Sequence, residues 1–481
     1  MLKLNKLSNH NRRFFSESLC SVLVAILFAL LLSRFLFEPT NVIVTILVLS
    51  PIVIFFFLSP KFPIYLLILS IIFTEFYWIE VLEGYLKPFH IISVLLFLVY
   101  TIFYLRVLRR SKITWLLIAF IFINIICALL SENKMDSLRS FILPLILISI
   151  AINTAVALST NRIYPDSLRK VILYGSLFAV FFGILQMLGY SFFDMLLTLT
   201  NRQDYQVALA KRSPSFFTEA VTFGKFLSFP FFLLLPFAFD KESKTAKSLK
   251  ISVTVLLIGI IINMTRSAMI GIGITLILYF FYLLRRESLS RNLGIFLGTA
   301  AMMLILLPFV IGITRVVGSY DKLIYVFQSL TNPATTIMED GSVRFRKAGF
   351  EETFKGTLES PSTFLWGRGW GQSSIYISNI RRDVGGNLFM NIAYYSGIFA
   401  LLLFLAVCYR ILNVLFHFSK NRDNKNRYLF AEGLLLSFIC MLIISQLASM
   451  WIAPEFWLVI GCAIFLEISE NELKNNRRLL H

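Results

Sequence analysis

Long apolar runs separated by short polar segments dominate the chain. Most of these runs have 18 or more residues, enough for an α-helix rising 1.5 Å per residue to cross a ~30 Å hydrocarbon layer. They lack the alternation of barrel strands, and helices satisfy their own backbone groups in lipid. The pattern predicts an all-α polytopic membrane protein, with one membrane-embedded domain over residues 1–481. About 14 transmembrane helices are expected, at 18–37, 41–58, 62–79, 88–105, 113–130, 138–158, 169–189, 219–239, 251–264, 267–284, 293–313, 387–409, 431–450 and 454–467.

Composition and charge agree with this prediction. The mean hydropathy is +0.77, and only 15% of the residues are charged, against about 25% in soluble domains. With a cytoplasmic N-terminus, the basic segments RVLRRSK, KESKTAK, RRESLSR and SKNRDNKNR all fall in the cytoplasm, as the positive-inside rule requires. Both termini are then cytoplasmic. Membrane topology accounts for the net charge of +18, so no nucleic-acid partner is expected.

The segment 251–284 is too long for one span, because a single helix of that length would measure about 51 Å. We expect a hairpin whose turn is MTRSA, which leaves Arg266 beneath the outer surface. Ionisable groups at that depth are costly and are usually functional.

Two outward segments are long: 190–218, and 314–386 between the eleventh and twelfth helices. Loops of this length are uncommon unless functional or disordered. In the second, apolar residues recur at helical spacing from Val343 to Leu358, and the Gly-rich WGRGWGQ follows. This pattern predicts an amphipathic helix over the active site and then a turn.

The residues favour chemistry without a metal or cofactor. Of the four histidines, His10, His417 and His481 are expected in the cytoplasm, and the outward His90 is interpreted as an interfacial residue rather than a catalytic one. No P-loop and no outward Asp pair with metal-ligand spacing is found. The cysteines all lie in apolar runs, where they are expected to act as small buried hydrophobes; they are Cys20, Cys127, Cys408, Cys440 and Cys462.

Arginines on the outer side are unexpected, because the positive-inside rule favours cations in the cytoplasmic loops. The guanidinium group offers a planar fork of donors that matches phosphate geometry and keeps its charge when partly desolvated. A diphosphate at the membrane surface would suit them, although a solvated loop charge accounts equally well for the last three. The outward arginines are Arg212, Arg266, Arg344, Arg346 and Arg368.

The stretch KRSPSFFTEAVTFGKF adds Glu219 and Lys225 to Arg212. Glu219 near a helix start is compatible with a carboxylate favoured by the helix dipole. It is also compatible with a carboxylate that orients an arginine or accepts a proton from a sugar hydroxyl. Lys225 lies about 9 Å deeper in the membrane than Glu219 at helical rise, and its side chain is expected to extend outward along the helix.

Three patches, in order along the chain, resemble the superfamily of O-antigen polymerases (Wzy-type) and O-antigen ligases, which are bacterial membrane glycosyltransferases. They are RSPSFFTEA, TRSAMIG and the outer segment from VRFRKAGFEETFKG through FLWGRGWG to GGNLFMNIAYYSGI, within residues 205–410. The resemblance implies that Arg212 and Arg266 hold the diphosphate of a polyprenyl-linked glycan. It also implies that Arg344 or Arg346 lies nearby.

The chain departs from that family at two positions. Ala220 follows Glu219 where many members have proline, and Gly386 precedes Asn387 where ligases have a catalytic histidine. The second departure favours polymerisation over ligation and leaves the base unassigned. Glu219 is our candidate base, and Arg266 is the expected stabiliser of the leaving group.

The resemblance implies an inverting, metal-independent polymerase on the outer face of the bacterial cytoplasmic membrane. Its donor and acceptor would be polyprenyl-diphosphate-linked oligosaccharides, joined into O-antigen, capsule or a related surface polysaccharide, with a chain-length regulator as a further partner. One alternative is an O-antigen ligase that transfers glycan to a lipid A core. Another is a lipid-linked oligosaccharide flippase or other transporter, for which charges in both halves and short outer loops are expected.

Overall fold

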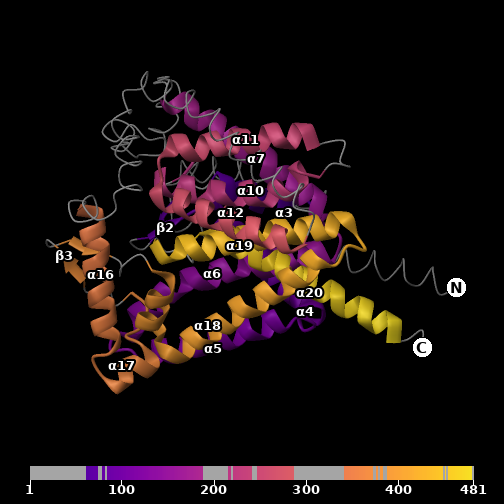
Figure 1. Cartoon of the computed structure of the whole chain (residues 1–481). Helices are drawn as coiled ribbons and strands as arrows, with labels where there is room; N and C mark the ends of the chain where they lie inside the picture. Colours follow the sequence, from indigo (N-terminus) through magenta and orange to yellow (C-terminus); the bar gives the residue numbers. More distant parts are fainter. Residues whose placement is uncertain are drawn as a thin grey trace, which may run out of the picture.

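The protein is a bundle of long helices (Figure 1). The computed structural model describes residues 61–73, 79–81, 84–187, 215–217, 220–240, 246–286, 341–371, 375–377, 380–382, 387–447, 450 and 453–478. The helices are α3 (Phe62–Ile72), α4 (Pro88–Leu108), α5 (Lys112–Leu130), α6 (Lys134–Ser159), α7 (Pro165–Met187), α10 (Ala220–Ala238), α11 (Ala246–Asn263), α12 (Arg266–Arg286), α16 (Gly341–Thr357), α17 (Pro361–Trp366), α18 (Leu388–Lys420), α19 (Lys425–Leu447) and α20 (Pro454–Arg478).

Within these residues, nine helices are long and apolar enough to cross a membrane: α4, α5, α6, α7, α10, α11, α12, α18 and α19. Large apolar side chains on their outer faces are exposed, as contact with lipid requires, and Trp115, Tyr174 and Phe281 are more than half exposed. The protein is therefore a multi-pass helical membrane protein. Three expected spans lie outside the described residues: 18–37, 41–58 and 293–313. Of the outward loop 190–218, the structure describes 215–217.

Two short antiparallel hairpins modify the all-α prediction. Strand β1 (Ile79–Val81) pairs with β2 (Gly84–Leu86), and β3 (Ile375–Ile377) pairs with β4 (Ile380–Arg382). The expected helix 62–79 instead ends at Ile72, because the backbone of Phe73 leaves the helical region (φ −103°, ψ 50°). Hydropathy alone cannot separate a short apolar strand from the end of an apolar helix.

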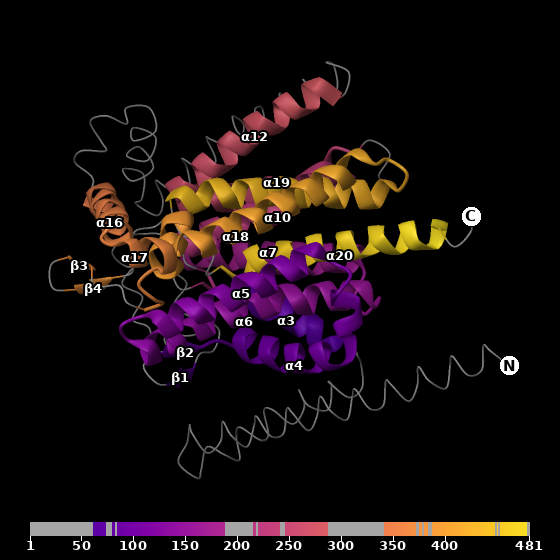
Figure 2. The same ribbon diagram turned by 90° about the horizontal axis from the view of Figure 1, so that it is seen from below.

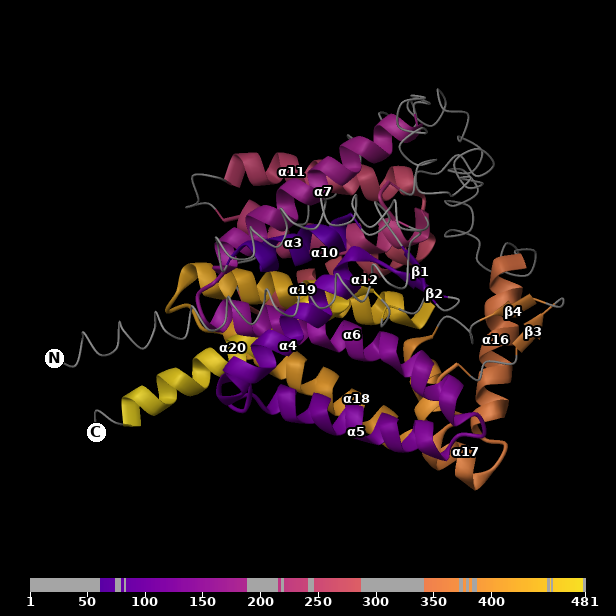
Figure 3. The same cartoon turned by 180° about the vertical axis from the view of Figure 1, so that it is seen from behind.

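The two ends of the bundle differ in character (Figures 2 and 3). The end that we call the basic end carries the turns 109–111, 160–164 and 421–424 and the C-terminal half of α20. The opposite end, which we call the α16 end, carries β1–β2, the turns 131–133 and 264–265, α16, α17, β3–β4 and the first turns of α10, α18 and α20. The cations near the basic end include Arg106, Arg109, Arg110, Lys112, Arg162, Arg169, Lys170, Lys247, Lys250, Lys420, Arg422, Lys425 and Arg427.

Four helices form the interior: α6 packs against α20, and α10 packs against α19. The inner face of α10 supplies large rings, and Phe226, Phe229, Phe231 and Phe232 are all buried. Ser437 of α19 donates a hydrogen bond from its hydroxyl to the Phe229 carbonyl (3.1 Å). Such contacts add specificity to packing between apolar helices.

An ion pair fixes the helices together at the basic end. Glu467 is 1% exposed, and its carboxylate accepts hydrogen bonds from the Arg410 guanidinium (2.7 and 2.6 Å) and the Ser111 hydroxyl (2.5 Å). The backbone N–H of Ile113 also donates to it (3.1 Å). This buried carboxylate joins α5, α18 and α20, which accounts for it without a catalytic role.

Candidate functional site

The predicted hairpin turn between 251 and 284 is confirmed: α11 ends at Asn263 and α12 begins at Arg266. Met264 adopts a positive φ of 55°, and the Thr265 hydroxyl donates a hydrogen bond to Asn263 Oδ1. Asn263, Met264 and Thr265 are all buried. Arg266 is half-buried at the first position of α12, so a guanidinium stands beside a turn of buried polar groups.

The first turns of α10 contact this hairpin turn. A Cβ atom added to Gly224 would lie 2.5 Å from Asn263 Oδ1 and 2.6 Å from Thr265 Oγ1. The α10 backbone therefore rests directly on the turn. Because Lys225 follows Gly224, its backbone also lies close to the turn that precedes Arg266.

A third helix places a buried carboxylate at the same end of the bundle. Glu455, the second residue of α20, is 1% exposed. Its Oε1 atom has no hydrogen-bond partner among the described residues. Lys225 itself is half-buried.

Helix termini meet at the hairpin turn. The N-terminus of α12 and the first turns of α10 lie together there, beside the C-terminus of α11. Helix N-termini carry partial positive charge and unpaired backbone N–H groups, which favour anions. Arg266, the first residue of α12, and the turn against which α10 packs form the candidate anion-binding site.

The helix predicted from 343 to 358 is confirmed as α16, which runs across the ends of the bundle helices (Figure 1). It docks on α18, since a Cβ atom added to Gly356 would lie 2.7 Å from the Tyr394 ring. In Figures 1 and 3 the N-terminal end of α16 is level with α10 and α12, and its C-terminal end is level with α5 and α18.

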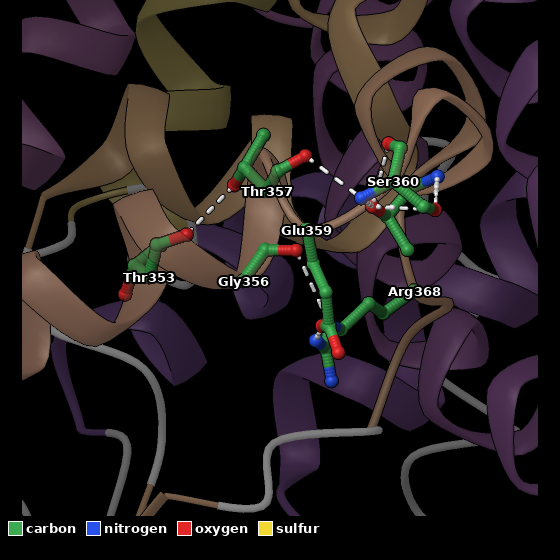
Figure 4. Close-up of polar contacts among 7 residues, drawn as sticks. Thr353, Gly356, Thr357, Glu359, Ser360 and Arg368 are labelled. Carbon is green, nitrogen blue, oxygen red and sulfur yellow. Dashed lines mark hydrogen bonds and ion pairs between the residues drawn. The ribbon is translucent and has the colours of Figure 1, made fainter.

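Arg368 has a structural role (Figure 4). Its guanidinium pairs with Glu359, donates from Nε to the Gly356 carbonyl (3.3 Å) and lies 5.6 Å from the centre of the Tyr394 ring. The neighbouring Ser360 caps α17 by accepting a hydrogen bond from the Thr363 N–H (3.1 Å). These contacts tie α16 to the Gly-rich turn, which accounts for Arg368 without a ligand.

The Gly-rich turn is built into the bundle through a break in α18. Gly397 (φ 74°, ψ −177°) and Gly367 (φ 74°, ψ −176°) occupy a region open essentially to glycine alone. A Cβ atom added to Gly397 would lie 2.1 Å from the Leu365 carbonyl oxygen. The break frees the Tyr394 and Tyr395 carbonyls to accept hydrogen bonds from the turn, at 2.8 and 2.9 Å.

Trp370 anchors the same turn on α5 and α6. Its indole N–H donates to Asn124 Oδ1 (2.8 Å), and its backbone N–H donates to the Ser137 hydroxyl (2.8 Å). The Ser396 hydroxyl donates to the same Asn124 oxygen. The turn is therefore a fixed part of the α16 end.

The predicted site residues divide into three groups. Arg266 lies in the candidate anion-binding site. Arg212 and Glu219 lie outside the described residues; α10 begins directly after Glu219. Arg344 and Arg346 lie in the first turns of α16, and their side chains are outside the described part.

Two further predictions concern residues at helix starts. His90 is buried in the first turn of α4, where its Nδ1 accepts a hydrogen bond from the Lys87 N–H (3.2 Å), so it acts as a cap. Asn387 caps α18 by accepting from the N–H groups of Phe389 (3.0 Å) and Met390 (3.1 Å). Sequence reasoning missed Glu455; the available signal was a glutamate after the proline that opens a strongly apolar run.

The four described cysteines are buried and unpaired, as expected, while Cys20 lies outside the described residues. No group of three His, Cys, Asp or Glu side chains within the described ranges is arranged to hold a metal ion. Metal-free chemistry stays a prediction.

No family model matches the chain, and no curated protein matches it. The function must therefore be argued from the arrangement of residues at the α16 end.

Proposed function

We propose that the protein is a polysaccharide polymerase that joins polyprenyl-diphosphate-linked oligosaccharides on the outer face of the bacterial cytoplasmic membrane. The observation that carries this proposal is the position of Arg266 at a buried polar turn against which the first turns of α10 pack, at the α16 end of a membrane-spanning bundle. Such a site suits the diphosphate of a lipid-linked donor, because the lipid tail can lie in the membrane while the anion meets cations at its edge.

The charge distribution supports the orientation. Cations concentrate at the basic end, which by the positive-inside rule faces the cytoplasm. The α16 end then faces outward, with both chain termini in the cytoplasm and about 14 spans in the whole chain.

In the proposed reaction, a hydroxyl oxygen of the incoming repeat unit bonds to the anomeric carbon of the growing chain. The bond from that carbon to the diphosphate breaks, and the electron pair leaves with the diphosphate. Arg266 and Arg212 stabilise the departing charge, with Arg344 or Arg346 beside them. Glu219 accepts the hydroxyl proton. Since the leaving group is already good, catalysis consists of positioning and electrostatic stabilisation.

The glycan profile of a deletion strain tests the proposal. We expect long chains to disappear while single repeat units remain displayed, and plasmid-borne wild-type protein to restore the ladder. Loss of all display would contradict polymerisation and indicate a ligase or a flippase.

Site variants in the same strain test the arginines. Arg266→Ala and Arg212→Ala should each lower polymerisation on the order of 10²-fold or more at unchanged protein level. Arg139→Ala, which removes an exposed arginine at the same end, should leave the ladder intact. Full ladders from both site variants would refute the site assignment.

A further inference from the structure

The hairpin formed by α4 and α5 is open along its length. A turn of three residues, 109–111, joins the two helices. Helices joined by so short a turn commonly pack against each other as antiparallel neighbours. Here each helix packs on α6, and few residues of one approach the other. A groove therefore runs between α4 and α5, with α6 as its floor.

The walls of this groove, which we call the α4–α5 groove, are mainly apolar. It encloses about 480 Å³, a volume within the range of roughly 300–1,000 Å³ that is usual for ligand sites. Apolar side chains from all three helices line it, among them Val94 and Leu105 of α4, Leu117 and Ile121 of α5, and Leu145 and Ile152 of α6.

The α4–α5 groove faces the lipid and reaches the basic end of the bundle. Ile118 and Ile142, which line it, are 44% and 53% exposed. Val94 and Arg109 also line it, and α4 rises about 22 Å between these two residues. This length is more than half of a ~30 Å hydrocarbon layer, so the groove can hold an acyl chain from the leaflet at the basic end.

Cations lie at the mouth of the groove. The Arg109 carbonyl accepts a hydrogen bond from the Trp115 indole N–H (3.2 Å). Trp115 is 52% exposed, and tryptophan side chains are enriched at the membrane–water interface. Arg110 pairs with Glu472 (2.5 Å). Arg109 and Lys112 on either side of it are exposed, and neither forms an ion pair within the described part of the chain.

We propose that the α4–α5 groove binds an anionic phospholipid from the leaflet at the basic end, with one acyl chain between the two helices and the phosphate beside Arg109. Charge complementarity identifies the occupant, because the wall is apolar, the mouth is cationic, and anionic headgroups attract basic residues at the membrane surface. The groove reaches the end of the bundle opposite to the candidate anion-binding site, so this lipid site does not depend on the proposed function.

Native mass spectrometry of the purified full-length protein tests the site with two lipids that carry the same chains, dioleoyl-phosphatidylglycerol and the zwitterionic dioleoyl-phosphatidylcholine. We expect the anionic lipid to bind at least about fivefold more tightly, which is the attraction that one basic residue adds near a charged headgroup. Arg109→Gln should remove this preference. Lys247→Gln, which removes an exposed lysine of α11 at the same end, should keep it. Equal binding of both lipids by the wild-type protein would overturn the proposal and indicate an ordinary lipid-facing surface.

Filling the groove tests where the lipid binds. Ile118→Trp places a larger side chain in the wall and should weaken binding of the anionic lipid on the order of tenfold. Ile102→Trp makes the same change on α4 at a residue that is 67% exposed and outside the groove, and it should bind like the wild-type protein. Equal binding by the two tryptophan variants would show that the lipid binds elsewhere, and the proposal would be wrong.

Fluorescence locates the lipid without altering the groove wall. The Trp115 signal is the part of the emission that Trp115→Phe removes. Phosphatidylglycerol with brominated chains should quench this signal more strongly than brominated phosphatidylcholine at the same mole fraction. Equal quenching by the two lipids would contradict selective binding at this groove.

Discussion

The contact between α10 and the hairpin turn can be disturbed with a single methyl group. In Gly224→Ala, the added Cβ would lie 2.5 to 2.7 Å from atoms of Asn263 and Thr265. Ordinary contacts of such atoms begin near 3.4 Å, so either α10 or the turn must move by several tenths of an ångström. Lys225 and Arg266 would then shift relative to each other.

The expected magnitude follows from two opposing effects. Overpacking a tight contact costs about 1–3 kcal/mol, whereas alanine gains about 1 kcal/mol over glycine within a helix. The net change in the free energy of unfolding is therefore about 0–2 kcal/mol, so the variant should fold. Catalysis is more sensitive, because a displacement near 1 Å can cost about 10²-fold in rate.

Gly273→Ala in α12 is the matched control. Nothing lies within 4 Å of the position where its Cβ would be placed, so it gains the helix propensity without the overlap. We expect Gly224→Ala to shorten the glycan ladder strongly at normal protein level, and Gly273→Ala to leave it unchanged. Equal ladders from both variants would refute the claim that this contact positions the site.

Three further predictions concern the framework and the orientation. Gly397→Ala combines a backbone conformation that costs about 1–3 kcal/mol with an overlap on the Leu365 carbonyl, so its thermal unfolding midpoint in detergent should fall clearly. Lys347→Cys, on the exposed face of α16, should react with an impermeant thiol reagent in intact spheroplasts, whereas Asp423→Cys at the basic end should react only after permeabilisation. Arg410→Met should lower the free energy of unfolding by about 3–5 kcal/mol, because it removes the charge partner of a buried carboxylate.

Each of these predictions has an internal comparison. Gly397→Ala would contradict the role of the α18 break if it unfolded at the wild-type temperature. The labelling experiment uses a Cys20→Ser background, since the four described native cysteines are buried; the reverse labelling pattern would overturn the orientation. Arg422→Met, which removes an exposed arginine at the basic end, should be close to neutral, and an equal loss in both arginine variants would count against the buried pair.

Features set by local patterns could be predicted from the sequence. The length of the apolar segment 251–284 required a turn, and the turn lies at the predicted residues. The helical spacing of apolar residues from Val343 onward predicted α16, and the glycines after it predicted the turn. Each of these depends on residues that are close together in the chain.

Features set by packing between distant segments could not be predicted from the sequence. Hydropathy averaged over a window hides one glutamate in an apolar run, so Glu455 went unnoticed. Its burial depends on α20 packing inside the bundle. The role of Arg368 likewise depends on Glu359 and Tyr394, which meet only when α16 docks on α18.

The most direct test supplies the purified protein with a synthetic polyprenyl-diphosphate-linked repeat unit, without nucleotide sugars or a lipid A core. We predict a ladder of products that differ by one repeat unit, with one polyprenyl diphosphate released for each linkage formed. We also predict that Arg266→Ala lowers both on the order of 10²-fold or more. An unchanged substrate, or transfer that occurs only when a lipid A core is added, would contradict the account.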